Sequence, residues 1–191
     1  YLTEHSFDDW PTFAVLDHEY ENLLAAILWA LEHSHPSAPR MARHFWRYLY
    51  VRGHWRQTEL VLSQALDQVT ASGEFLSRLL FKSSVAWILV ERGQYAEARQ
   101  HLQQVEAEAV NLDSRDLLAV RNVFNSLGQA YLGLNDLKQA EIYEQHFLEL
   151  AEQANDPHDI LVARYYLAWI KACSGCLVDV APISQHLDAV V

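Results

Sequence analysis

Apolar residues recur at helical spacing along nearly the whole chain. Leu23, Ile27 and Leu31 stand four residues apart, as on the apolar face of one amphipathic helix. The alternating pattern that marks a half-buried strand is almost absent. The sequence therefore predicts an all-α fold.

A short sequence motif interrupts the helical pattern four times. Each copy is a Gly or Asn followed two residues later by a large apolar side chain, and the copies stand at Gly53, Gly93, Asn135 and Gly175. Successive copies are 40, 42 and 40 residues apart. Gly readily adopts the left-handed backbone in which many helices end, and Asn tolerates it better than most residues. The motif therefore marks the end of one helix and the start of the next. The chain is predicted to be a stack of helix pairs.

These turns divide the chain into segments. Residues 1–17 are acidic and aromatic without a clear period, and we expect a connecting segment there. A leading helix is expected over 18–35, ended by Pro36 and Pro39. Four helix pairs follow, at about 40–70, 73–110, 114–155 and 157–191, so that residues 18–191 are predicted to form a single solenoid domain.

Small residues recur at fixed distances from the turns, where two helices would cross closely. The positions are Trp46, Ala86, Gly128 and Ala168 before the turn and Thr58, Ala98, Ala140 and Val180 after it, with Trp46 and Val180 the large exceptions. This arrangement resembles the tetratricopeptide repeat (TPR), which Leu127-Gly128, Tyr131 and Ala140 match best. The resemblance implies a right-handed α-solenoid of about four TPR-like pairs, with a binding function and no catalysis.

The period is longer than the usual 34 residues of this repeat. At about 40 residues it resembles the sensor arrays of bacterial STAND-class signal-transducing ATPases. Residues 16–32 resemble the helix that joins the nucleotide-binding and winged-helix modules to the repeats in that class, and residues 50–55 resemble the first repeat turn. The resemblance implies a sensor that binds an inducer or partner and releases the autoinhibited ATPase module of a transcriptional regulator. The alternatives are a peptide-pheromone receptor of the TPR class and a general protein–protein interaction adaptor.

The first helix of each pair is expected to line a concave surface. The residues on that face are Arg40, Arg43, His44, Arg47 and Tyr50 in the first pair, Trp87 in the second, Asn122, Asn125, Ser126 and Gln129 in the third, and Tyr165, Tyr166 and Trp169 in the fourth. Arginines three and four residues apart project together and repel unless an anion compensates. Amides can bond a peptide backbone, and aromatic rings supply contact area. The expected partner is a protein or peptide with a carboxylate, or a small inducer.

Two alternatives for these residues involve no partner. In one, the acidic N-terminal segment or Glu19, Glu21 and Glu32 pair with the arginines. In the other, Trp87 and Trp169 pack against neighbouring repeats.

Composition narrows the remaining possibilities. A formal net charge of −11 argues against direct nucleic-acid binding by the chain as a whole, and no apolar run reaches the roughly 20 residues of a membrane span. No Gly-Lys-Ser or Gly-Lys-Thr phosphate loop is present, so an ATPase module would belong to another part of the parent chain. The start at Tyr1, without Met or a signal peptide, suggests an excised piece.

Cys173 and Cys176 have the spacing of a redox or half-zinc motif. They coincide with the fourth turn, and no second cysteine pair exists, so a structural turn is favoured. Two close cysteines fit a reducing cytoplasm better than secretion. We expect a cytoplasmic protein with no catalytic residue, no cofactor and no metal.

Overall fold

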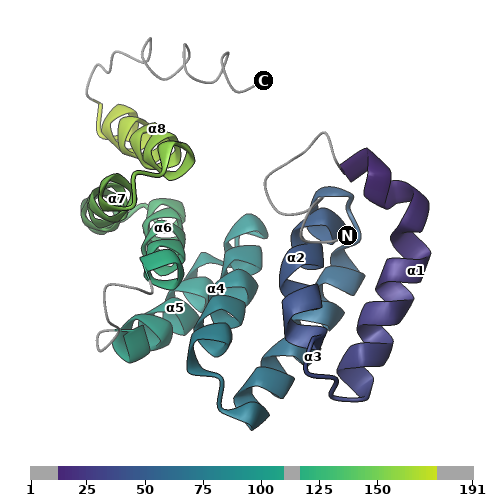
Figure 1. The fold of residues 1–191 in the computed structure, drawn as a ribbon. Helices are drawn as coiled ribbons and strands as arrows, with labels where there is room; N and C mark the ends of the chain where they lie inside the picture. The colour runs from purple at the N-terminus through teal and green to yellow at the C-terminus, as the bar shows by residue number, and fades with distance from the viewer. Residues whose placement is uncertain (1–12, 110–116, 176–191) are drawn as a thin grey trace. The chain divides into compact units, whose positions relative to one another are not determined.

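The structure is a computed structural model that describes residues 13–109 and 117–175. Figure 1 shows these residues as helices joined by short turns. The helices are α1 (Phe13–Glu32), α2 (Ala38–Val51), α3 (Trp55–Ser72), α4 (Phe75–Glu91), α5 (Tyr95–Ala109), α6 (Leu117–Gly133), α7 (Leu137–Gln153) and α8 (Pro157–Cys173). No strand occurs within these ranges, and none of their helices is long and apolar enough to cross a lipid bilayer. The predicted all-α class is confirmed.

The chain divides into two compact units, residues 1–85 and 86–191, and the boundary lies inside α4. In the first unit α2 packs against α3, and α1 packs against both. In the second, α5 packs against α6, α6 against α7 and α7 against α8, and α8 also contacts α6. The contacts of α2 with α3 and of α6 with α7 lie within the predicted first and third pairs, and the second half of the pair at 157–191 lies outside the described residues.

The predicted turns are present at all four positions. Gly53, Gly93, Asn135 and Gly175 have φ angles of 77°, 72°, 59° and 80°. At the third turn the amide of Asp136 donates to the carbonyl of Tyr131 at 2.9 Å, and the Asp136 carboxylate accepts from the amide of Gln139 at 3.2 Å. Asn135 thus takes the left-handed place that Gly holds elsewhere, while the next residue caps the following helix.

The leading helix differs from its predicted limits. Already at Phe13 the described chain is helical, five residues before the expected start, and Phe13 and Leu16 are buried. The helix ends at Glu32 because Ser34 adopts a left-handed backbone with a φ of 49°. Pro39 does not end this helix but lies in the first turn of α2, where its missing amide hydrogen costs nothing.

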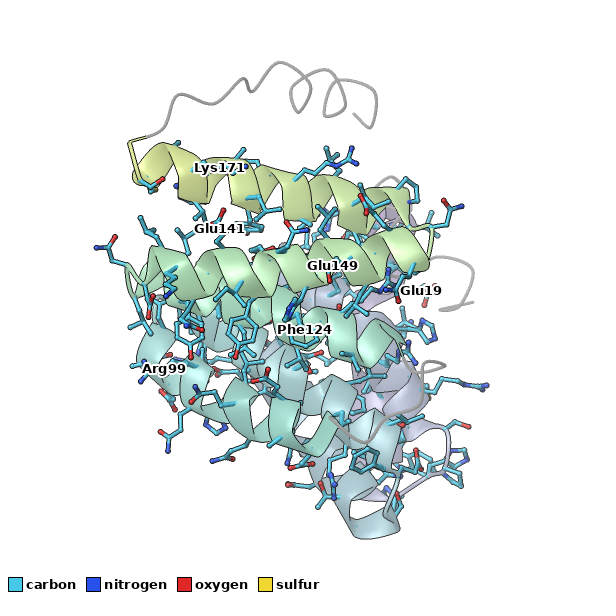
Figure 2. All side chains as sticks on the ribbon, turned by 90° about the vertical axis from the view of Figure 1, so that its left-hand side faces the viewer. Glu19, Arg99, Phe124, Glu141, Glu149 and Lys171 are labelled. Atoms are coloured by element: carbon cyan, nitrogen blue, oxygen red, sulfur yellow. The ribbon has the colours of Figure 1, made fainter. Side chains whose placement is uncertain are left out.

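The second unit stacks α6, α7 and α8 in layers (Figure 2). Phe124 lies where α6 meets α7, with its ring centroid 5.5 Å from that of His146. Close crossing depends on small residues: Ala98 and Ala140 are fully buried, and a Cβ placed on Gly133 would overlap the Tyr95 ring. The expectation that small side chains mark tight helix crossings is confirmed at Ala98 and Ala140.

Candidate binding surfaces

A basic stripe follows α2 and consists of Arg40, Arg43 and Arg47. Arg40 is exposed, and the other two are half-buried. Within the part of the chain that the structure describes, the side chains of Arg40 and Arg43 form no ion pair and no hydrogen bond. Glu19, one of the acids that offered an alternative partner, accepts a hydrogen bond from Asn22 at 2.8 Å. Among the described residues, at least these two cations of the stripe thus have no acidic partner.

His44 lies within the basic stripe and is half-buried. Burial lowers the pKa of its imidazole, and the charges of Arg43 and Arg40 lower it further. The imidazole is therefore neutral at neutral pH, with one nitrogen able to accept a hydrogen bond and the other able to donate.

The end of α2 is held by an acid from α1 rather than by a ligand. The Asp17 carboxylate accepts from the Tyr48 hydroxyl at 2.8 Å and from Arg52 Nε and Nη2 at 2.9 and 2.8 Å. The Tyr48 hydrogen bond lowers the pKa of Asp17, opposed by burial and reinforced by Arg52. Asp17 was assigned to a connecting segment, so sequence reasoning missed this contact, which joins residues 31 and 35 positions apart.

Tyr50 ends the predicted α2 face and meets Trp55 of α3. The two ring centroids are 4.8 Å apart with planes at 79°. Tyr50 is half-buried, whereas Trp55 is 45% exposed. Trp55 thus supplies most of the exposed aromatic surface at this turn, and the sequence prediction did not include it.

The amides predicted on α6 divide into accessible and covered side chains. Asn122 and Asn125 are half-buried, and Gln129 donates to Asn125 Oδ1 at 2.7 Å. Ser126 and Gln129 are only 3% and 7% exposed. For these two, the expectation of an open surface is wrong, because neighbouring helices cover that part of α6. Asn122 and Asn125 remain as candidate contacts.

The predicted aromatic residues of α8 form one cluster. Tyr165 and Trp169 are 43% and 47% exposed, while Tyr166 is half-buried. Tyr166 and Trp169 lie nearly parallel at 11°, with centroids 6.1 Å apart, and Tyr165 meets both at steep angles. The alternative that Trp169 is packed away is not what the structure shows. Trp87 of α4, in contrast, is half-buried.

Comparison with solved structures agrees with this architecture. Two structures of a Podosopora anserina protein, described as a putative kinesin light chain with nearly identical TPR-like repeats, superpose on this chain. One of them, a single-substitution variant, gives a TM-score of 0.62 at 18% identity over 94% of this chain and 87% of that one. The other gives 0.60 at 18% identity over 91% and 86%. The chain has a TPR-like fold. No family model and no curated protein matches the sequence.

The sequence already has Glu144 where the repeat usually carries an apolar residue, and the structure shows how that carboxyl is accommodated. Glu144 of α7 is 0% exposed, and neither carboxylate oxygen has a hydrogen-bond partner among the described residues. Burial raises the pKa of this carboxyl to about 9, so it is protonated at neutral pH. It fits because Gly128 lies opposite, where any Cβ would overlap the Glu144 side chain.

A buried ion cluster joins α6 to the start of α8. Arg121, 6% exposed, contacts the carboxylates of Asp156 at 3.1 Å and Asp159 at 2.9 Å. Asp156 also caps α8 by accepting from the Asp159 amide at 3.2 Å. Burial alone would raise the pKa of Asp156, but the bonds from the Asp159 backbone and Arg121 lower it. The cap was predictable from sequence, whereas its partner 35 residues away was not.

The cysteine motif is described only in part. Cys173 is an exposed free thiol at the end of α8, and Cys176 lies outside the described residues. Between them Gly175 has the left-handed φ of 80° that the repeat turn requires. Across residues 13–109 and 117–175, no three His, Cys, Asp or Glu side chains converge as metal ligands do.

Proposed function

We propose that this chain is a protein- or peptide-binding module, and that the basic stripe on α2 contacts a carboxylate of the partner. The observation that carries this proposal is that Arg40 and Arg43 have no ion pair within the described residues. Arginines one turn apart on one helix repel each other, and a carboxylate between them removes that repulsion and accepts charge-assisted hydrogen bonds.

A peptide-binding experiment tests the stripe. Labelled peptides of about ten residues are prepared with a free and with an amidated carboxyl terminus, and binding to the whole chain is followed by anisotropy. We expect the free-carboxylate peptides to bind more tightly, and Arg43→Glu to weaken them about tenfold or more, since a hydrogen bond to a charged group contributes about 1.5–3 kcal/mol.

The matched control is Arg56→Glu, which makes the same charge change at an exposed residue of α3. It should leave binding within about twofold. Equal losses for Arg43→Glu and Arg56→Glu would mean that only net charge matters, and the stripe would lose its role. No preference for the free carboxylate would remove the carboxylate from the proposal.

The finer proposal is that the module is the sensor of a bacterial STAND-class regulator that acts in the cytoplasm. It is supported by the resemblance of residues 16–32 and 50–55 to the joining helix and first turn of that class. It is also supported by the packing of α1 against α2 and α3, because a joining helix must belong to the first repeats structurally. Binding of a partner or small inducer would then release the ATPase module of the parent chain.

The sequence encoded upstream of Tyr1 tests this assignment. A phosphate loop followed by a winged helix would support the regulator, and Arg43→Glu in that parent should abolish induction. A helix-turn-helix there would instead favour a peptide-pheromone receptor. If neither module is encoded there, the general adaptor is favoured.

A further inference from the structure

We infer that the aromatic face of α8, made by Tyr165, Tyr166 and Trp169, is a second docking surface and that it takes a partner segment carrying arginine or lysine. It goes beyond the function proposed above because it lies on another helix and selects the opposite charge.

The exposure of this face is unusual within its own unit. Among the described residues of unit 86–191, Tyr165 and Trp169 are the exposed Phe, Tyr or Trp side chains, at 43% and 47%. The other described rings of this unit are half-buried or buried, with Tyr131 at 7% and Phe147 at 1%. Leaving an indole and a phenol half in water forgoes burial that would otherwise stabilise the fold, which is a property of contact surfaces.

The rings are also held in a defined arrangement. Trp169 contacts Tyr166 in a nearly parallel stack and Tyr165 at 67°, with centroids 6.1 and 5.9 Å away. These neighbours restrict the rotation of the indole before any partner arrives. Binding therefore costs little side-chain entropy, and the faces of the rings are already presented.

The charges around this face favour a cation. Residues 86–191 contain 15 acidic against 7 basic residues, so most of the net charge of −11 belongs to this half of the sequence. Burial raises the pKa of Tyr166, and the charge of nearby Glu91 raises it further; Glu144 also lies close to Tyr166 but is protonated at neutral pH and adds no charge there. Glu91 is exposed and ends α4, where the helix carbonyls add negative potential. Aromatic faces in such a field attract guanidinium and ammonium groups.

The two basic residues of α8 do not cancel this field. Arg164 pairs with Glu152 of α7 at 3.4 Å. Lys171, labelled in Figure 2, follows Trp169 by two residues and therefore points to a different side of the helix. Neither basic residue of α8 is thus placed to occupy the rings, and we assign the cation to a partner.

Two peptides serve as probes. The first carries several arginines spaced by Gly and Ser, and the second, its twin, has citrulline at each of these positions. Citrulline keeps the size and planarity of arginine but carries no charge. Binding to the whole chain is measured by anisotropy for wild type, Trp169→Leu and the control Trp55→Leu, which removes a 45% exposed tryptophan from the other unit. Neither substitution changes net charge.

We expect the arginine peptide to bind at least about tenfold more tightly than its twin. Trp169→Leu should weaken the arginine peptide about fivefold to tenfold, within the range of cation–π contacts, and Trp55→Leu by less than about twofold. If the circular dichroism spectrum shows that Trp169→Leu perturbs the fold, Tyr165→Leu replaces it, because it removes the second exposed ring and should weaken the arginine peptide in the same way. Glu91→Gln should also weaken the arginine peptide.

Three outcomes would overturn the proposal. Equal binding of both peptides, lost together in Trp169→Leu, would make the face an apolar docking surface without charge selection. Equal effects of Trp169→Leu and Trp55→Leu would mean that the arginine peptide binds the acidic protein without using α8. Absence of binding to wild type would leave the face with no cationic partner.

Discussion

Replacing Glu144 by Gln should remove most of a pH dependence that the buried carboxyl imposes on stability. In the folded chain its pKa is about 9, against 4.5 for the free side chain. Below pH 4.5 both states are protonated, and above pH 9 both are ionised. Between these values the unfolded chain releases a proton that the folded chain keeps, so stability falls as pH rises.

The magnitude follows from the size of the shift. Each pH unit inside this window lowers the free energy of unfolding by about 1.4 kcal/mol, which amounts to about 4 kcal/mol between pH 5 and pH 8. At pH 7 the cost of keeping the carboxyl neutral is about 3 kcal/mol. Glu144→Met, which fills the same slot with an apolar chain, should therefore raise stability at pH 7 by up to about 3 kcal/mol.

The assay is urea unfolding followed by far-UV circular dichroism at pH 5, 6, 7 and 8. The difference in free energy of unfolding between wild type and Glu144→Gln at each pH isolates the contribution of this carboxyl, because all other groups titrate in both proteins. The matched control is Glu149→Gln, an exposed acid on the same helix, labelled in Figure 2. Parallel pH profiles for wild type and Glu144→Gln would refute the reasoning, because they would show that the carboxyl ionises in the folded state at little cost.

Three further substitutions test the packing and the ion pairs. Gly128→Ala should destabilise by about 1–3 kcal/mol, because the added Cβ overlaps Glu144, and Glu144→Ala in the same chain should restore much of the loss in thermal midpoint. Arg121→Ala should cost about 2 kcal/mol in urea unfolding, because it leaves two partly buried carboxylates without their cation; a loss no larger than that of Arg164→Ala, whose ion pair is exposed, would contradict this. Asp17→Asn should cost less than about 1 kcal/mol in urea unfolding above pH 5, and this cost should shrink as pH falls below 3.8, since the lowered pKa of Asp17 contributes stability that is lost as pH falls; a pH-independent effect would exclude this explanation.

The helical fold was predictable because its signals are local. A left-handed residue between two helices favours Gly or Asn, so Gly53 and Asn135 mark their turns in the sequence itself. The start of α1 was not found, since Phe13 and Leu16 gain their helical role from burial against other helices.

The candidate surfaces were predictable only in part, for a related reason. Repeat register places Ser126 of α6 and Tyr166 of α8 at equivalent positions, nine residues before Asn135 and Gly175, but Ser126 is buried whereas Tyr166 is only half-buried. Whether a side chain is accessible depends on how far its neighbour reaches across it. The burial of Glu144 and the pairing of Arg121 likewise depend on contacts between segments distant in sequence.

The Arg121 ion cluster has a consequence for how the array melts. In a solenoid each repeat contacts only its neighbouring repeats, so a helix with weak contacts to them can open by itself. Here Arg121 of α6 bonds to residues at the start of α8 and passes over α7. Opening of α8 must therefore break a contact two helices away. Amide hydrogen exchange should therefore give similar opening free energies for α6, α7 and α8, as expected when the three helices open as one cooperative unit.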